Sequence, residues 1–174
     1  MTAVVRRLRT VDGATLQALS DMLVAVVASG ASVSFMHPVT AERAQAFWRG
    51  VALGVEAGDR ALLVAEEAGH VVGTVQLLWK LPENQPHRAE VAKLMVHPRT
   101  QKRGIGAALM HAIEVEARAA RKTLLVLDTE TGGPAEKLYA RLGWQLCGRI
   151  PDFALRPHGG LAATTIFYKA VSSA

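Results

Sequence analysis

The spacing of hydrophobic and polar residues divides the chain into helix-like and strand-like segments. Two helices are expected early in the chain, over residues 13–28 and 41–57. Asp12 and Thr40 stand directly before them, and both are residue types whose side-chain oxygen caps the first turn of a helix. A glycine closes each segment, as at many helix ends. Residues 30–36 lie between the two helices without a regular period, so a loop is expected there.

Short apolar runs separated by turn residues predict a set of strands. Residues 123–127 form a continuous apolar run before an aspartate, which is typical of a strand buried on both faces. A loop that carries Pro151, Pro157, Gly159 and Gly160 is expected between the last two strands. The expected strands cover residues 3–9, 62–66, 71–80, 88–96, 123–127, 144–149 and 163–170.

Two further helices are expected between the later strands. Residues 104–121 have the spacing of an amphipathic helix, because apolar residues recur on one stripe. The stripe consists of Ile105, Leu109, Ile113 and Ala117. Pro134 suits the first turn of a helix over residues 134–142, because the N–H that proline lacks has no partner at a helix start. No repeat or linker interrupts this order, so one α/β or α+β domain over residues 1–174 is expected.

Composition narrows the function classes. Half of the 174 residues are hydrophobic, which is enough for a sizeable core. The net charge of +5 comes from basic residues scattered along the chain, so no nucleic-acid partner is expected. Cys147 is the only cysteine and no two histidines have helical metal-pair spacing, so no metal is expected. Without a membrane-length apolar run or a secretory signal, a cytoplasmic protein is expected.

The segment from Leu94 to Gly106 carries the clearest chemical signal. The chain breaks a strand at Pro98 and turns into a helix, whose first N–H groups and dipole form an anion site. Gly104 and Gly106 carry no side chain that would keep a phosphate away. The glycine spacing is too short for a nucleotide P-loop, and the three-glycine dinucleotide fingerprint is absent. We therefore interpret the turn from Gln101 to Gly106 as a phosphate site for a small polyanion.

Gln101-x-x-Gly104-x-Gly106, after a strand that ends near Val-x-Pro, resembles the signature of the GNAT superfamily of acetyl-CoA-dependent N-acyltransferases. Residues 135–144 (AEKLYARLGW) look like the family's second motif, a helix that carries Leu-Tyr and ends at Gly-aromatic. The resemblance covers essentially the whole chain. It implies an α+β fold with a mixed, mostly antiparallel sheet of about seven strands, flanked by about four helices and splayed at its central strands.

The resemblance also implies transfer of acetyl from acetyl-CoA to an amine. Backbone groups of residues 94–96 would hold the pantetheine and the thioester carbonyl oxygen. Tyr139 matches the family's tyrosine near the CoA sulfur, where it could protonate the departing thiolate; a core tyrosine is the alternative. The residues implied to bind the cofactor are Leu94, Met95, Val96, Gln101, Lys102, Arg103, Gly104, Ile105, Gly106, Ala107 and Tyr139.

Glu90 and Asp128 are two candidates for the general base that takes a proton from the acceptor amine. Strict alternation places Glu90 on the same face as Leu94, and Asp128 closes an apolar run. Both carboxylates are therefore expected to be partly desolvated, with raised pKa values. The alternative for each is a strand-end carboxylate paired with Arg or Lys. Lys93 is expected on the side opposite to Glu90, in a structural or solvated role.

Residues 30–36 (GASVSFM), 88–96 (RAEVAKLMV) and 127–130 (LDTE) resemble the tabtoxin-resistance group of GNAT enzymes, which acetylate a β-lactam dipeptide-type toxin. This likeness favours a small-molecule amine, amino-acid-like or antibiotic-like, and hence a resistance role. A protein N-terminal or lysine acetyltransferase and a non-catalytic acyl-CoA sensor are the alternatives, and the chain could pair as a homodimer. The residues expected to bind the acceptor are Ser32, Ser34, Phe35, Met36 and Trp48, with a core position as the alternative for the last three. Residues 152–160 could form another wall of the pocket.

Overall fold

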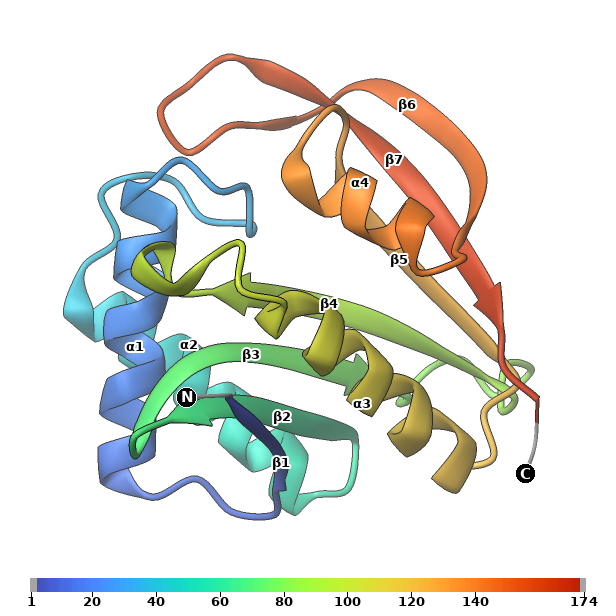
Figure 1. Cartoon of the computed structure of the whole chain (residues 1–174), viewed down its shortest axis with the longest axis horizontal. Coiled ribbons are helices and arrows are strands. Elements are labelled where there is room, and N and C mark those ends of the chain that lie inside the picture. The colour runs from blue at the N-terminus through green and yellow to red at the C-terminus, as the bar shows by residue number, and fades with distance from the viewer. Residues whose placement is uncertain (1–2, 173–174) are drawn as a thin grey trace.

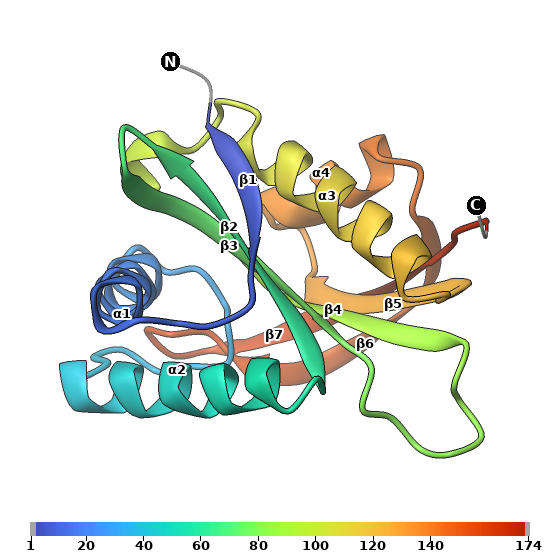
Figure 2. The same cartoon turned by 90° about the horizontal axis from the view of Figure 1, so that it is seen from below.

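The computed structural model describes residues 3–172, and its central feature is a seven-stranded sheet with helices on both faces (Figures 1 and 2). The expected domain also included residues 1–2 and 173–174, which lie outside the described part. In chain order the elements are β1 (Val4–Leu8), α1 (Gly13–Ala28), α2 (Ala41–Glu56), β2 (Arg60–Glu67), β3 (His70–Leu78), β4 (Arg88–Val96), a 3-10 helix (Pro98–Thr100), α3 (Ile105–Ala119), β5 (Leu124–Glu130), α4 (Pro134–Arg141), β6 (Gln145–Leu155) and β7 (Leu161–Ala170).

The strands follow the order β1-β2-β3-β4-β5-β7-β6, and every neighbouring pair is antiparallel except β4 and β5. The parallel pair is short: residues 88–90 of β4 pair with residues 124–126 of β5, and no pairing follows. Both strands continue past this point, so they diverge (Figure 1). The expected fold is confirmed, with a mixed, mostly antiparallel sheet, four helices and a splay at the central strands.

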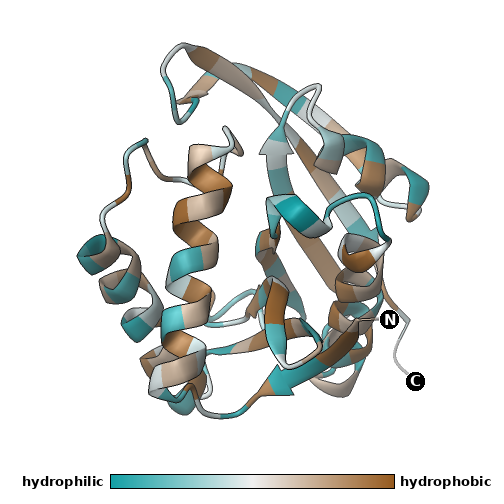
Figure 3. Cartoon of the chain, turned by 60° about the vertical axis from the view of Figure 1, so that its left-hand side comes forward, coloured by the Kyte–Doolittle hydropathy of each residue, from teal (hydrophilic) through white to brown (hydrophobic). Residues whose placement is uncertain are grey.

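Two apolar cores lie on the two faces of the sheet. One joins the sheet to α3 and α4, and the other joins it to α1 and α2 (Figure 2). Figure 3 shows apolar residues along α1 and the strands. The expected stripe on α3 is confirmed, because its four residues are 0–5% exposed: Ile105, Leu109, Ile113 and Ala117.

The start of α3 is pressed closely against the sheet at Gly73. A Cβ at this position would lie 3.0 Å from both Ile105 Cγ2 and Leu109 Cδ1. Contacts this short force neighbouring atoms to move, so a glycine in β3 lets the helix approach. This packing positions the turn that precedes α3 beside the end of β4.

The predicted helix starts are confirmed by their hydrogen bonds. The Asp12 carboxylate accepts from the Thr15 N–H at 2.7 Å, and the Thr40 hydroxyl oxygen accepts from the Arg43 N–H at 3.2 Å. Pro134 occupies the first turn of α4, as expected.

The expectations for two of the later strands need correction. The predicted loop after residue 149 is wrong, because β6 continues to Leu155 and pairs with β7 through a bulge between Ile150 and Ala154. Pro151 is tolerated because β6 is an edge strand and a bulge leaves residues unpaired. β5 is also not buried on both faces: Leu125 and Leu127 are buried, whereas Val126 is only partly covered, next to the splay.

Within residues 3–172, no helix has both the length and the apolar character needed to cross a bilayer. In the same part of the chain, no three His, Cys, Asp or Glu side chains gather closely enough to hold a metal ion.

Trp48 was expected as a possible pocket residue, and the structure places it in the core instead. Its side chain is 0% exposed and belongs to the core beneath α1 and α2. It faces inward because it lies on the sheet-facing stripe of α2 with Ala44 and Val51. The core alternative is therefore the one observed.

The burial of Trp48 leads to a prediction about stability. Trp48→Ala is expected to lower the free energy of unfolding by about 3–5 kcal/mol, because it removes a large buried side chain and leaves a cavity. Chemical denaturation measures the change. Leu53→Ala is the control, because Leu53 lies on the same helix and is 67% exposed; its effect is expected to stay within about 0.5 kcal/mol. Equal effects of the two changes would contradict this packing.

Candidate active site

A cavity of about 190 Å³ lies where β4 and β5 diverge. Its walls come from the loop after α1 (residues 32–34), β4 (residues 91–94), the end of β5 (residues 128–130), Tyr139 of α4, and the β6–β7 hairpin (residues 153–155 and 162–164). The hairpin wall agrees with the expectation for residues 152–160, although residues 153–155 belong to a strand. The cavity thus joins segments that are far apart in the sequence.

A β-bulge at Lys93 reverses the two faces of β4. Gln76 pairs with Ala92 and Thr74 pairs with Met95, so one residue of β3 faces two residues of β4. Lys93 takes up the extra length with φ of 55°, in the left-handed region. A bulge of this kind shifts the alternation of side chains by one position.

The placement of Glu90 on the same face as Leu94 is therefore wrong. Val91, the neighbour of Glu90, belongs to the core beneath α3, and Leu94 packs against that same core. Beyond the bulge Met95 lies in the core of the opposite face. Strict alternation holds only while every residue is paired, and the unpaired residue at Lys93 breaks it.

The expected desolvation of the two carboxylates is also wrong. The Glu90 side chain is 46% exposed, does not line the cavity, and pairs with Arg88 at 3.1 Å. The ion-paired alternative therefore describes Glu90. Asp128 is exposed as well, but it lines the cavity, and its Oδ2 accepts a hydrogen bond from the Thr164 hydroxyl at 3.1 Å. The structure thus brings only Asp128 into the cavity.

Tyr139 lines the same cavity from α4 and is otherwise enclosed, with 5% of its surface exposed. Its ring lies 6.0 Å from those of Trp144 and Phe167. Burial, and secondarily the negative charge of Asp128, hold the pKa of Tyr139 well above its ordinary value. The phenol therefore keeps its proton at neutral pH and is available as a donor.

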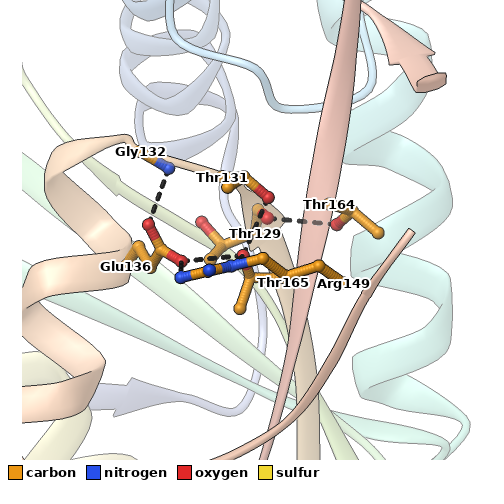
Figure 4. A network of polar contacts seen from close by, with 7 residues as sticks. All are labelled: Thr129, Thr131, Gly132, Glu136, Arg149, Thr164 and Thr165. Carbon is orange, nitrogen blue, oxygen red and sulfur yellow. Dashed lines mark hydrogen bonds and ion pairs between the residues drawn. The ribbon is translucent and has the colours of Figure 1, made fainter. Parts of the chain in front are cut away.

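A polar network holds the end of β5 and the start of α4 against β6 and β7 (Figure 4). Its centre is Glu136, which accepts hydrogen bonds from the Gly132 N–H at 2.6 Å and from the Thr165 hydroxyl at 2.8 Å. Arg149 adds an ion pair at 3.0 Å. These partners, first of all the Gly132 N–H, lower the pKa of Glu136. The same network places Asp128 and Tyr139, since it fixes the elements that carry them.

This network was missing from the sequence-based expectations, although one signal for it was present. Glu136 is the third residue of α4, where a glutamate can reach back to an N–H before the helix. The partners Arg149 and Thr165 belong to β6 and β7. They are distant from Glu136 in the sequence, so local sequence patterns could not predict these contacts.

Lys93 was expected in a structural or solvated role, and the structure places it in the cavity. Its Nζ donates a hydrogen bond to Ser34 Oγ at 2.9 Å. Burial lowers the pKa of Lys93, and the negative charge of Asp128 acts in the opposite direction. The period-two pattern of β4 contains no sign of the bulge, so the alternation of residues could not predict this position of Lys93.

The turn before α3 offers backbone donors. Gly104 has φ of 81° and caps α3 without a side-chain hydrogen bond. Within residues 3–172, the N–H groups of Ile105, Gly106 and Ala107 have no hydrogen-bond partner. Free N–H groups at the positive end of a helix dipole suit a phosphate group. The arrangement therefore fits the pyrophosphate of acetyl-CoA.

The two glycines of this turn have different roles. At Gly104 a Cβ would have nothing within 4 Å, so space does not require glycine there. Glycine is favoured instead by the left-handed backbone conformation, which other residues rarely adopt. Gly106 is needed for packing, because its Cβ would lie 3.2 Å from Leu138 Cδ2 of α4. The turn is thus fitted to α4 as well as open to an anion.

Several side chains of the expected cofactor set already have partners inside the protein. Arg103 pairs with Glu67 at 2.5 Å, and Gln101 Nε2 donates to the Val96 carbonyl at 3.3 Å. The side chains of Met95 and Ile105 are 2% and 5% exposed, so these residues can offer a cofactor only backbone groups. Lys102, with φ of 61°, is exposed, and Ala107 is partly buried.

Only part of the expected acceptor set reaches the cavity. Ser32 and Ser34 line it, whereas Phe35 and Met36 do not. The Phe35 ring packs edge-on against Phe47 with 5.2 Å between ring centroids, and Met36 is 38% exposed. Ser32 and Ser34 thus line the cavity together with Val33, whereas Phe35 packs against the core of α1 and α2.

Comparison with known proteins identifies the class. Residues 58–146 match the family model described as Acetyltransferase (GNAT) domain. A relative from Azospirillum brasilense, described as an uncharacterized N-acetyltransferase in the hisH-hisA intergenic region, is 30% identical over 126 residues, which are 71% of this chain and 73% of the relative. The chain belongs to the GNAT family of acetyl-CoA-dependent N-acetyltransferases.

Solved structures agree with this fold. The structure of yncA from Salmonella typhimurium with its cofactor acetyl-CoA is 22% identical, with a TM-score of 0.79, and the match covers 100% of this chain and 96% of that one. A phosphinothricin acetyltransferase from Sinorhizobium meliloti in complex with acetyl-CoA is 19% identical, with a TM-score of 0.79 and coverage of 99% and 90%. At these identities the likeness shows the shared fold.

The open turn before α3 leads to a binding prediction. Gly104→Asp is expected to weaken acetyl-CoA binding about tenfold or more, since it adds a carboxylate beside free N–H groups that suit a phosphate. Isothermal titration calorimetry with acetyl-CoA measures the affinity. Gly58→Asp is the matched control: Gly58 also has positive φ, of 75°, and nothing lies within 4 Å of its Cβ, but it follows α2. Unchanged affinity in Gly104→Asp, or an equal loss in the control, would refute this cofactor position.

Proposed function

We propose that the protein acetylates the amine of a small molecule in the cavity between β4 and β5. The observation that carries this proposal is the shape of the site: Asp128, Tyr139 and the diverging edge of β4 meet in one cavity of about 190 Å³. A volume of this order suits a small acceptor or the tip of a longer one. Homodimer formation and a cytoplasmic location stay predictions from the sequence.

The walls of the cavity favour a small acceptor over a polypeptide. The loop after α1 is tied to the β6–β7 hairpin, because the His37 N–H donates to the Pro157 carbonyl at 2.9 Å. The rings of His37 and His158 also lie 4.6 Å apart. A polypeptide acceptor needs an open groove on this side. The likeness of residues 30–36, 88–96 and 127–130 to the tabtoxin-resistance group supports an amino-acid-like or antibiotic-like amine, and a resistance role.

The chemical roles follow from which groups face the cavity. Acetyl-CoA supplies an acetyl group activated as a thioester. Asp128 accepts the proton that the acceptor amine loses as its nitrogen bonds to the acetyl carbon, directly or through water. Tyr139 donates a proton toward the departing sulfur, since its raised pKa keeps the phenol protonated. The unpaired edge of β4 beyond Glu90 offers backbone N–H groups for the carbonyl oxygen.

An acceptor screen tests the proposal directly. The purified protein is incubated with acetyl-CoA and with three sets of amines: amino-acid-like and β-lactam-containing compounds, peptides with a free N-terminus, and lysine peptides. Release of free CoA thiol and the mass of the acetylated product report transfer. Transfer to the first set supports the proposal, whereas transfer to the peptide sets alone would overturn the small-molecule assignment.

Matched substitutions of Asp128 and Glu90 test which of the two carboxylates is the general base. Asp128→Asn is expected to lower kcat/KM about 100-fold at neutral pH, because a general base is lost. The loss should shrink as the pH approaches the pKa of the amine, since the acceptor then loses its proton unaided. Glu90→Gln is the control and is expected to retain activity, because Glu90 lies outside the cavity. A larger loss in Glu90→Gln would reverse the assignment.

Removal of one hydroxyl tests the proton donor. Tyr139→Phe is expected to lower kcat about 100-fold while acetyl-CoA affinity and thermal stability stay nearly unchanged, because the ring packing is preserved. Tyr168→Phe on β7 is the control, since Tyr168 does not line the cavity. Steady-state kinetics and calorimetry provide the two readouts. Full activity of Tyr139→Phe with an amine of ordinary reactivity would remove the acid role.

A further inference from the structure

Lys93 and Ser34 meet in the cavity from two separate segments, and both have unusual backbone conformations. The Lys93 Nζ donates to Ser34 Oγ at 2.9 Å, across 59 residues of sequence. Both residues have positive φ, of 55° for Lys93 and 73° for Ser34. Residues other than glycine disfavour this region, and such conformations gather at functional sites. Two residues in this disfavoured region thus bring an ammonium and a hydroxyl together in the cavity.

The ammonium of Lys93 has fewer hydrogen-bond acceptors than N–H donors and no ion-pair partner within residues 3–172. An ammonium has three N–H donors, and Ser34 Oγ is the one acceptor that Lys93 has within residues 3–172. In the same part of the chain, no carboxylate lies within 4.0 Å of Nζ. Burial accordingly lowers the pKa of Lys93. A partly buried cation with free donors is stabilised when an anion binds beside it.

The position of Asp128 indicates which kind of molecule would supply that anion. Asp128 lines the same cavity from β5 and is close enough to act electrostatically on Lys93, yet the two side chains form no ion pair. Part of an acceptor can therefore lie between them. An acceptor with an amine at Asp128 and an acidic group at Lys93 would match both charges.

We propose that Lys93, together with Ser34, binds a carboxylate of the acceptor, so that the preferred acceptors are amines that also carry an acid. This inference rests on the proposed function, because it uses the same cavity. Lys93 would then determine acceptor specificity, because it would distinguish amino-acid-like amines from simple amines of equal size.

Matched acceptors test the preference. L-Leucine, L-leucinamide and 3-methylbutylamine share a side chain, and only the first carries a carboxylate; further amino acids with their amides and decarboxylated amines extend the panel. Rates are expressed per unprotonated amine, because the three amines differ in pKa. The wild-type protein is expected to favour the acids about tenfold or more in kcat/KM. Equal rates for acids and decarboxylated amines across the panel would overturn the inference.

Substitution of the lysine tests its role. Lys93→Met keeps most of the side-chain length and removes the charge. The substitution is expected to raise KM for the acids about 10- to 100-fold, with little change in kcat. The KM for the decarboxylated amines is expected to stay unchanged. Lys80→Met is the control, since the Lys80 side chain is 75% exposed and pairs with Asp59. An equal loss on acids and decarboxylated amines would show a structural role and refute the proposal.

Two further experiments distinguish failure of this inference from failure of the proposed function: a second variant and a binding measurement. Ser34→Ala should weaken the acid preference by a smaller factor, and it provides a second variant if Lys93→Met does not fold. Acetyl transfer to simple amines without any acid preference would leave the proposed function standing and remove the carboxylate site. If no amine is acetylated, calorimetry with the acids in the presence of CoA still decides: weaker binding to Lys93→Met than to wild type supports the site, and no binding to wild type overturns it.

Discussion

The separation of β4 from β5 is the constraint on which the rest of the site depends. Three paired residues on each strand join the two halves of the sheet, and beyond Glu90 and Val126 the strands diverge. Backbone groups along the inner edge of β4 are left without a partner strand, which is costly unless water or a ligand pairs with them. The same divergence opens the cavity that Asp128, Tyr139 and Lys93 share.

Packing on both faces of the sheet stabilises the structure around this opening. Helices α1 and α2 cover one face with a core that contains Trp48, while α3 and α4 cover the other face. The network around Glu136 then holds β5, α4, β6 and β7 together at the edge of the cavity. The core beneath α3 and α4 contains residues of β2, β3, β4, β5 and β7, so packing on that face joins both halves of the sheet although two of its strands diverge.

Charge in the cavity is distributed between two strands. Asp128 is held by Thr164, and Lys93 is held by Ser34, so the negative and the positive group are fixed separately and do not neutralise each other. Tyr139 lies beside them with a pKa raised mainly by burial. A proton donor, a proton acceptor and a cation thus line one cavity, an arrangement that suits acyl transfer.

Local patterns in the sequence determined the helices, most of the strands and the turn from Gln101 to Gly106, because caps, apolar periods and glycines act within a few residues of one another. The apolar run before Asp128 singled out that carboxylate, and the resemblance to the GNAT family singled out Tyr139; both line the cavity. Local patterns failed for Glu90 and Lys93, since one unpaired residue in β4 reverses its faces without leaving a trace in the alternation. They failed also for Trp48, whose helix face is decided by the sheet beneath it. Only the tertiary structure decided which charges share the cavity, because those contacts join β4, β5 and the loop after α1 across long stretches of chain.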